Sequence, residues 1–387
     1  MGMSQVKNTM VTNLSASKLT GALPAVDGSA LTGVSPFMTN SSDPAIDSNP
    51  ADGLGTVWAN TTSGEMFILT DATAGSNVWT NVGAGTGDVE PWYFPGTISG
   101  YTAGGLNPTS KLDKIDKFSF SSDSNAVAYS GDLTLARYSP TGYTSNTHGY
   151  VSGGSKIASP LVVDTIDKFS FTTEGNATDV GNLTTANEDA TGNSSNTHGY
   201  NCGGYSGGNS DKIEKNSFAT DGNSTDIGNL TVARFSPCGC PSTTHGYMGG
   251  GKGVGIPQQN VIDKFSFSTD GNATDVGDMT STVQLSYGTS STTHGYSSGG
   301  LVGSQSNVIQ KFSFSVDSNA TDIGDLTIAV YGPAGQTSTT HGYSSGGHIS
   351  SNNISNVIEK FPFASDANAT DVGDLVVNRH YAAGTQY

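Results

Sequence analysis

Cysteine, charged side chains and long hydrophobic runs are all scarce in this chain of 387 residues. The cysteines are Cys202, Cys238 and Cys240, and because three is an odd number we expect no framework of disulfide bonds. No apolar run approaches the length needed to cross a bilayer, and the residues after Met1 are too polar for a signal peptide. These absences argue against membrane insertion and predict assembly inside a cell.

Basic residues are also few: 16 Lys and Arg stand against 33 Asp and Glu, which leaves a net charge of -17. Nucleic acid and anionic membrane surfaces repel such an acidic chain, so neither is an expected partner. A sustained helical period is missing as well. The chain instead carries 52 glycines and short segments that alternate with period two between turn residues. This pattern is typical of an all-β, loop-rich fold.

One composite motif recurs about every fifty residues from residue 98 onward. It consists of Thr-His-Gly-Tyr, a Gly-Gly pair, Ile-Asp-Lys-Phe-Ser-Phe and Asp-x-Asn-Ala-Thr-Asp-Val-Gly-Asp-Leu. Its tyrosine falls at Tyr101, Tyr150, Tyr200, Tyr247, Tyr296 and Tyr343. A period near fifty with a glycine pair after a short strand resembles the kelch repeat, which builds one four-stranded blade of a β-propeller. Six copies therefore predict six blades.

Each repeat predicts four strands, named a to d in chain order. In the repeat from 282 to 328, strand a precedes Thr293-His294, strand b covers 294–300, strand c covers 307–314 and strand d covers 321–326. Between strands c and d, Asp317-Ser318-Asn319 predicts a tight turn, because Asp and Asn tolerate positive φ and bond their own backbone.

The two ends of the repeat region complement each other. The first copy is too short between Trp92 and Gly100 to hold a strand a, whereas residues 379–387 align with residues 137–145 and stop where the next turn would begin. We expect this orphan strand to pair with the strands of residues 98–134. One C-terminal and three N-terminal strands then close the ring and leave no open sheet edge.

The region before residue 98 is different in kind. Residues 12–35 are low in complexity and too sparse in apolar side chains to fold alone, whereas residues 53–83 contain three short β-type segments. The glycine-rich residues 83–87 are typical of a flexible linker. We expect an extended arm over 1–50, a small β unit and linker over 51–90, and a six-bladed kelch-like β-propeller with C-terminal strand closure over 91–387.

The N-terminal region also carries a resemblance. The run Ala-Ser-Lys-Leu-Thr-Gly-Ala-Leu-Pro-Ala-Val-Asp-Gly-Ser-Ala-Leu-Thr-Gly, residues 16–33, resembles the virion-attachment end of tail-fibre and related structural proteins of tailed bacteriophages. The block Gly-x-Val-Trp-x-Asn-Thr-Thr-Ser-Gly at 55–64, followed by Val-Trp-x-Asn-Val, resembles these proteins too. The repeats are similar to kelch-like virion proteins of phages that infect marine bacteria, including cyanobacteria.

This resemblance implies a structural protein that is located in the virion and assembled in the host cytoplasm. The arm would dock on other virion proteins through Leu14, Leu19, Leu23 and Leu31. The propeller would adhere to a host surface receptor or glycan, and the fibre-type arm implies a homo-oligomer, with a trimer favoured. We expect no enzymatic activity and no cofactor. Two alternatives stay open: a capsid, neck or baseplate decoration protein, and a propeller enzyme, either a carbohydrate-active hydrolase or a copper oxidase.

Two repeated polar motifs have a structural explanation and a ligand-binding alternative. The histidines that precede Gly-Tyr are His148, His198, His245, His294 and His341. We expect each to brace the turn after strand a by a local bond; a ring of metal ligands is the alternative. The Asp-x-Asn-Ala-Thr-Asp segments are explained by turn chemistry, and their alternatives are a calcium loop or an Asp-box turn of the sialidase type.

Other repeated positions predict the core. Eleven of the 15 phenylalanines form strand c doublets such as Phe265 and Phe267, which we expect between blades. Lys264, in the same strand, is expected to snorkel or to pair with an Asp of strand d.

Strand a is rich in small residues, which predicts the innermost strand, so Cys238 and Cys240 are expected to pack rather than to bind metal or do redox chemistry. The three arginines, Arg137, Arg234 and Arg379, share one position at the start of strand a. We expect a structural bond to a neighbouring loop; a sulfate or glycan contact is the alternative.

Strand polarity places the ab and cd turns at one end of the propeller and the bc and da connections at the other. The first set is nearly identical among repeats and the second varies, and variation on a rigid scaffold is where recognition is usually built. Loops that are merely unconstrained are the alternative. The candidate receptor-binding residues are Lys156, Ile157, Pro160, Tyr205, Lys252, Pro257, Gln258, Gln259, His348, Asn352 and Asn353. An enzyme would instead need a non-repeating cluster of acid, base or ligand residues in an axial pocket. The sequence offers His348, His380, Glu188 and Asp189 for it, but nothing in the sequence brings them together.

Overall fold

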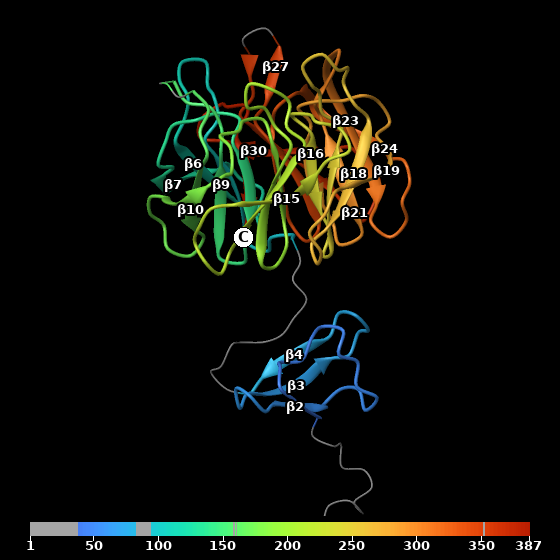
Figure 1. Ribbon diagram of the computed structural model, residues 1–387. Coiled ribbons are helices and arrows are strands. Elements are labelled where there is room, and N and C mark those ends of the chain that lie inside the picture. Colours follow the sequence, from blue (N-terminus) through green and yellow to red (C-terminus); the bar gives the residue numbers. More distant parts are fainter. Residues whose placement is uncertain (1–37, 83–93, 158, 160, 351–352) are drawn as a thin grey trace, which may run out of the picture. The chain divides into compact units, whose positions relative to one another are not determined.

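A computed structural model describes residues 38–82, 94–157, 159, 161–350 and 353–387 of the chain (Figure 1). The chain divides into two compact units, Met1–Pro91 and Trp92–Tyr387. The predicted attachment residues Leu14, Leu19, Leu23 and Leu31 lie outside the described residues.

The first unit contains a four-stranded sheet in the order β1-β2-β3-β4. Its strands are β1 (Met38–Asn40), β2 (Val57–Asn60), β3 (Met66–Asp71) and β4 (Val78–Asn81). The predicted β segments correspond to β2, β3 and β4, whereas β1 lies in the stretch assigned to the arm and pairs parallel to β2. The core is Trp58, Phe67, Leu69 and Trp79, and the two Trp rings meet edge to face at 5.8 Å. Few apolar side chains suffice here because the two tryptophans bury large areas.

The second unit is all-β and forms six four-stranded antiparallel sheets, the blades of a β-propeller (Figure 1). The predicted order a-b-c-d is confirmed in every blade. Blades 2, 3 and 4 are regular. Blade 2 consists of β8 (Thr141–Thr144), β9 (His148–Ser152), β10 (Thr165–Ser170) and β11 (Thr178–Asn182). Blade 3 consists of β12 (Thr191–Ser194), β13 (His198–Cys202), β14 (Lys212–Ser217) and β15 (Thr225–Asn229). Blade 4 consists of β16 (Cys238–Pro241), β17 (His245–Gly249), β18 (Val261–Ser266) and β19 (Thr274–Asp278).

Blades 5 and 6 carry short additions in their bc connections. Blade 5 consists of β20 (Tyr287–Ser290), β21 (His294–Ser298), β23 (Ser304–Ser313) and β24 (Thr321–Val330), and β22 (Leu301–Val302) pairs with the extended start of β23. Blade 6 consists of β25 (Ala334–Thr337), β26 (His341–Ser345), β29 (Val357–Pro362) and β30 (Thr370–Asp374), with the two-stranded addition β27 (His348–Ser350) and β28 (Asn353–Ile354).

Blade 1 closes the ring as the sequence predicts. It consists of β5 (Ser99–Ala103), β6 (Lys114–Ser119), β7 (Val127–Asp132) and the C-terminal strand β31 (Ala383–Gln386). The strand β31 pairs antiparallel with β5, from Ala383 opposite Ala103 to Gln386 opposite Gly100. The orphan strand a therefore comes from the far end of the chain.

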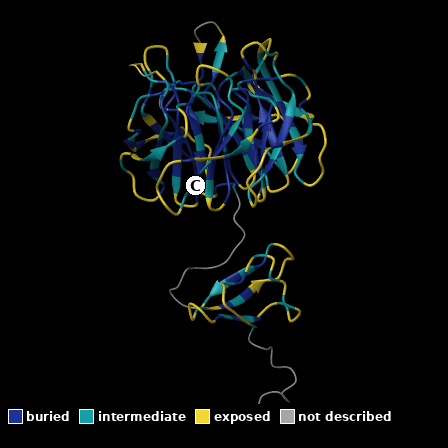
Figure 2. Cartoon of the chain, in the orientation of Figure 1, coloured by how far each residue is buried: buried dark blue, intermediate teal, exposed yellow. Residues whose placement is uncertain are grey.

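Residues of the blade strands are largely buried (Figure 2). Aromatic side chains pack between blades, which confirms the predicted inter-blade core. The repeat tyrosine of strand b stacks on the aromatic residue that directly follows strand c in the next blade, as Tyr247 does on Phe314 at 4.8 Å. The other five pairs are Tyr101–Phe171, Tyr150–Phe218, Tyr200–Phe267, Tyr296–Phe363 and Tyr343–Phe120. Each blade is thus held by its successor, and the sixth by the first.

In the cd connection the first Asp and the Asn of the motif bind the preceding blade, which corrects the predictions for the lysine and for these two positions. The last Asp makes the predicted local bond, since Asp322 Oδ1 accepts from the Gly324 N–H. Lys264 of β18 pairs with Asp317 of blade 5 at 2.6 Å, and not with an Asp of its own strand d. The Asn319 Oδ1 accepts a hydrogen bond from the backbone N–H of Asp278 at the end of β19, and Ala320 N–H donates to the Asp278 carbonyl. We call this set of contacts the inter-blade latch.

The inter-blade latch recurs at all six blade junctions. The further ion pairs are Lys117–Glu174, Lys168–Asp221, Lys215–Asp270, Lys311–Asp366 and Lys360–Asp123. The further asparagines are Asn125, Asn176, Asn223, Asn272 and Asn368. The glycine in the Asp-Val-Gly-Asp part of the repeat is needed for steric reasons, since a Cβ atom on Gly277 would lie 2.6 Å from the carbonyl oxygen of Ser318 in the next blade. The Asp-x-Asn repeat therefore encodes blade-to-blade contact.

The axis of the propeller is closed by glycine, as the small residues of strand a predict. One glycine of each strand a, except in blade 6, abuts the backbone of a glycine in the preceding strand a, so that an added Cβ would collide with it. In blade 6, Gly335 abuts the ring of Tyr287 in place of backbone. The six positions are Gly142, Gly192, Gly239, Gly288, Gly335 and Gly384. Only glycine permits this approach of six backbones.

Candidate functional site: the axial cavity and its rim

The two ends of the propeller are built differently. We call the end with the ab and cd turns the turn face, and the end with the bc and da connections the loop face; the hairpin β27 marks the loop face in Figure 1.

On the turn face, the five repeat histidines make the predicted local bond. In each case the Nδ1 atom lies 2.8 Å from the hydroxyl of the preceding threonine. The backbone N–H of the histidine donates to a serine hydroxyl three residues earlier, as His294 does to Ser291. Burial, together with a nearby lysine, lowers the pKa of each of these half-buried histidines. Each one braces its own turn.

Behind the loop face, the three arginines are fully buried and make structural bonds. Arg137 and Arg379 donate to the bc-connection carbonyls of Gly153 and Gly104, as expected, and all three arginines also pair with a carboxylate of strand c. Arg137 pairs with Asp167 at 2.6 Å, Arg234 with Asp263 at 3.1 Å and Arg379 with Asp116 at 2.9 Å. The same carboxylate accepts bonds from the da connection; Asp263, for example, accepts from both the N–H and the hydroxyl of Thr231. These pairs fix the chain just before it reaches the axis.

The repeats that lack arginine compensate with a longer acceptor. Blade 3 combines Asn187 with Glu214, blade 5 combines Val283 with Gln310, and blade 6 combines Val330 with Glu359. In blade 5 the Gln310 Oε1 accepts both bonds from Thr280, at 2.7 Å each. The longer side chain thus reaches the da connection where no guanidinium holds a shorter carboxylate in place.

The mouth of the axis is a closed ring of six backbone hydrogen bonds. Six equivalent residues donate in turn, each N–H to the carbonyl of its neighbour, with distances of 2.6 to 3.1 Å. They are Ser139, Asp189, Ser236, Leu285, Gly332 and Tyr381. All six have left-handed backbones, with φ between 52° and 62°, although five are not glycine. Such backbones cost about 1 kcal/mol or more each and concentrate at ligand sites. We call this set the axial ring.

A second, outer circle of residues surrounds the axial ring. The residue before each axial-ring position forms an antiparallel bridge with the residue after a Gly-Gly pair. The six bridges are Tyr138–Ser155, Glu188–Tyr205, Phe235–Lys252, Gln284–Leu301, Tyr331–His348 and His380–Leu106. The backbone pairing repeats around the axis, whereas the side chains do not. A fixed frame therefore presents a different chemical group in each blade.

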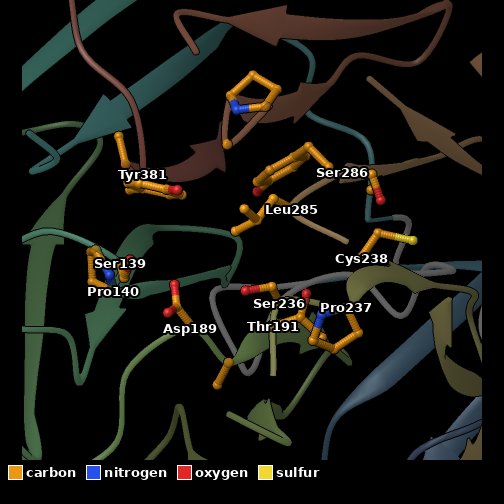
Figure 3. A pocket seen from close by; sticks show the side chains of 16 residues that line it. Ser139, Pro140, Asp189, Thr191, Ser236, Pro237, Cys238, Leu285, Ser286 and Tyr381 are labelled. Carbon is orange, nitrogen blue, oxygen red and sulfur yellow. The ribbon is translucent and has the colours of Figure 1, made fainter. Parts of the chain in front are cut away.

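The axial ring surrounds a small cavity of about 80 Å³ that is open to solvent (Figure 3). Its rim and walls include Ser139, Asp189, Ser236, Leu285 and Tyr381, together with the residue that follows each axial-ring position. Its floor is Tyr287, whose hydroxyl is hydrogen-bonded to the backbones of Gly335 and Gly384 in other blades. The cavity consequently opens on the loop face and is sealed below by the glycine contacts.

Asp189 is the only carboxylate among the residues that line the cavity. Protein surrounds its carboxyl on the sides away from the cavity, and this burial raises the pKa of Asp189 to about 6. A hydrogen bond from Ser139 opposes the rise, and the nearby charge of Glu188 adds to it. The site is thus a partly desolvated carboxylate that still accepts hydrogen bonds at neutral pH.

Aromatic rings gather beside the cavity on the side of blades 1, 2 and 6. Tyr381 lies 6.3 Å from Tyr138 and 6.1 Å from Tyr331, and His348 stacks on Tyr331 at 4.7 Å. The imidazole of His380 lies 5.3 Å from that of His348, and burial lowers the pKa of His380 to about 4. These histidines are neutral at pH 7.

The structure brings together residues that the sequence left apart. His348 and His380 share the aromatic cluster, while Glu188 and Asp189 belong to the outer circle and the axial ring. Of the predicted receptor-binding residues, Tyr205, Lys252 and His348 occupy equivalent positions in the outer circle. Lys156, Pro257, Gln258 and Gln259 lie in bc connections, where the Gln258 Nε2 donates to the Leu301 carbonyl of the next blade at 3.0 Å. Ile157 and Asn353 are exposed. Pro160 and Asn352 lie outside the described residues.

Sequence reasoning missed the axial ring and Tyr381. Both depend on a left-handed backbone just before strand a. The residue types found there, Ser, Asp, Leu and Tyr, give little indication of such a backbone. The available signal was the register of the repeats, since these residues align immediately before the small residues of strand a.

The three cysteines are free and buried, and Cys238 and Cys240 belong to the packed core between blades 4 and 5, as predicted. Within the described residues, no three His, Cys, Asp or Glu side chains group closely enough to hold a metal ion. No helix in the same part of the chain is long and apolar enough to cross a membrane.

Compared with models of known protein families and with curated proteins, this chain has no significant match. Its function must therefore be inferred from the residues themselves.

Proposed function

We propose that this chain is a virion structural protein of a tailed phage whose propeller adheres to the host surface through the loop face. The observation that carries the proposal is the axial ring with its outer circle, where a repeated backbone frame holds unrepeated side chains around a cavity. Identical blades cannot discriminate between partners, whereas a ring of different side chains can.

Exposed apolar side chains are more numerous on the loop face than on the turn face, where Val127 and Val316 are exposed. In the propeller, Ile157, Leu161, Val254 and Val302 are large hydrophobic residues of the bc connections that are 38 to 72% exposed. Exposed apolar groups on a polar surface are a common feature of binding sites. The lone carboxylate in the cavity also favours binding over glycoside cleavage, which ordinarily uses two carboxylates.

The assignment to a virion rests on the resemblance of residues 16–33 and 55–64 to phage fibre proteins. On this proposal the arm attaches the chain to other virion proteins, as a homo-oligomer for which we favour a trimer. Labelling of intact particles with an antibody against the propeller tests the location. Labelling at a tail fibre or baseplate is expected for an adhesin, whereas a capsid or neck location would favour the decoration alternative.

Cell binding tests the adhesive face. The fluorescently labelled full chain is incubated with a panel of marine bacteria, including cyanobacteria, and bound protein is measured by flow cytometry. Replacing Ile157, Leu161, Val254 and Val302 by Ser is expected to abolish binding. The matched control is Val316→Ser, which alters a 63% exposed valine on the turn face and should bind normally. Loss of binding in the control alone would reverse the face assignment.

A further inference from the structure

We infer, on the basis of the proposed function, that the axial cavity binds the terminal residue of a neutral sugar chain. Three properties of the cavity carry this inference: its charge, its hydroxyl groups and its aromatic wall.

The charge of the cavity excludes anionic ligands. The lining contains the carboxylate of Asp189 but neither Lys nor Arg. The charged and titratable groups that face Asp189 are Glu188 and Tyr381, and Lys111 lies near Glu188 but over the ring of Tyr138, 4.4 Å from its centroid. A carboxylate or sulfate on a ligand would meet this negative charge in a partly desolvated site without compensation.

The hydroxyl groups match a ligand with several donors and acceptors. Ser139 donates to the Asp189 carboxyl. The Oγ atom of Ser236, on the other side of Asp189 in the axial ring, is buried and has no hydrogen-bond partner among the described residues. Buried polar atoms are rarely left unpaired, so this hydroxyl is available to a ligand. Vicinal sugar hydroxyls can donate to Asp189 while accepting from Ser236.

The aromatic wall suits the apolar face of a sugar ring. Tyr381 and Asp189 are both hydrogen-bonded neighbours of Ser139 in the axial ring, and Figure 3 shows their side chains along one side of the cavity. Tyr381 is backed by Tyr138 and Tyr331, so its ring cannot easily move away. A sugar that donates its hydroxyls to Asp189 would lay its C–H face against Tyr381.

The closed axis below the cavity favours a chain end. Tyr287 and the glycine contacts seal the axis below the cavity, so a glycan cannot thread through the propeller. An internal sugar of a polymer would need two exits, whereas a terminal residue needs one. The bc connections would then contact the following sugars.

The experiment measures binding of free sugars to the full chain by saturation-transfer NMR and calorimetry. The probes are neutral hexoses and N-acetylhexosamines, with glucuronate and N-acetylneuraminate as anionic probes and ethanolamine as a small ammonium probe. We expect at least one neutral sugar to bind and the anionic probes to fail. Asp189→Ser should lower the affinity for the neutral sugar by about tenfold or more, since a charge-assisted hydrogen bond is lost. Serine is tolerated at the equivalent positions Ser139 and Ser236, so this variant keeps a residue that suits the backbone.

Two further arms keep the test decisive. Affinity of the wild-type chain should fall as the pH drops through about 6, where Asp189 becomes protonated, and the pH dependence should vanish in Asp189→Ser. Ser236→Ala provides a second variant if Asp189→Ser misfolds, and the turn-face change Asp317→Asn is the control. Preferred binding of ethanolamine or an anionic sugar, or neutral-sugar binding that is insensitive to both cavity variants, would overturn the inference. If Asp189→Ser binds cells normally while the quadruple loop variant does not, the adhesive function stands and the sugar site falls.

Discussion

The turn face and the loop face are made from the same six repeats, yet they use repetition in opposite ways. On the turn face the side chains repeat, and each makes a defined bond to its own turn or to the preceding blade. On the loop face only the backbone repeats, in the axial ring and the outer circle, while the side chains differ. In this propeller, side chains that repeat in every blade stabilise the fold. Side chains that differ between blades, held on a backbone that repeats, are the candidates for recognition.

The largest effect is expected from deleting the strand that closes the ring, on which both faces depend. Deleting residues 379–387 takes away β31 and the Arg379 ion pair, and leaves β5 with an open edge. We expect aggregation, or loss of the cooperative unfolding transition, measured by size-exclusion chromatography and calorimetry. Val376→Ser, which changes an exposed residue just upstream, should melt like the wild-type chain. An unchanged melting curve for the deletion would refute closure by β31.

The buried pairs behind the loop face should give the largest effect of a point change. Asp263→Ala leaves the guanidinium of Arg234 buried without a counter-charge, although it still donates to the Met248 carbonyl, and we expect the free energy of unfolding to fall by about 3–5 kcal/mol. The double change Arg234→Val with Asp263→Gln copies blade 5, and most of the loss should be recovered. Chemical denaturation measures both. A double variant no better than Asp263→Ala would show that the blades are not interchangeable at this position.

The axis itself should be intolerant of a single methyl group. Gly288→Ala forces a Cβ into the backbone of Gly239, and we expect a loss of about 3 kcal/mol. The control is Gly271→Ala in a cd connection, where an added Cβ meets nothing within 4 Å. That change should be nearly neutral in thermal denaturation. Equal melting temperatures for the two variants would contradict the closed axis.

Acid should destabilise the folded chain through protonation of His380. Its pKa is lowered from 6.5 to about 4 in the folded chain, so the unfolded chain binds the proton more readily. The contribution to stability is therefore present above pH 6.5 and is lost as the pH falls toward 4, on the order of 2 kcal/mol. His380→Gln copies Gln284 of blade 5 and should flatten this part of the profile. Parallel profiles for the two proteins would exclude His380 as the cause.

The smallest effects are expected on the turn face. Asn319→Ala removes one acceptor of the inter-blade latch and should cost about 1 kcal/mol, because the Asp278 N–H is partly accessible to water. Asp317→Asn breaks an exposed ion pair and should cost about 0.5 kcal/mol, less at high salt. Neither should change cell binding. Denaturation at low and high salt, with the cell assay in parallel, measures this; lost adhesion would place recognition on the turn face.

Local patterns in the sequence were enough for much of the fold. Period-two segments, the fifty-residue spacing and the matching ends predicted six blades, the strand order and closure by β31. The small residues of strand a predicted the crowded axis, and the Thr-His turn predicted its own bond. Each of these depends on residues that are near in sequence or repeat in register, so the physical cause is visible in the chain itself.

The contacts that position the candidate site were decided only when the ring closed. Lys264 and Asp317 are 53 residues apart, and Asp263 could be assigned to Arg234 only once the two were buried together. Asp189 and Tyr381 are far apart in the chain and become neighbours of Ser139 because the six strands a converge on one axis. Their left-handed backbones are held by the six hydrogen bonds of the axial ring and not by residue type. The repeated sequence determines the strands and turns of each blade. The packing of six blades around one axis determines which side chains surround the cavity.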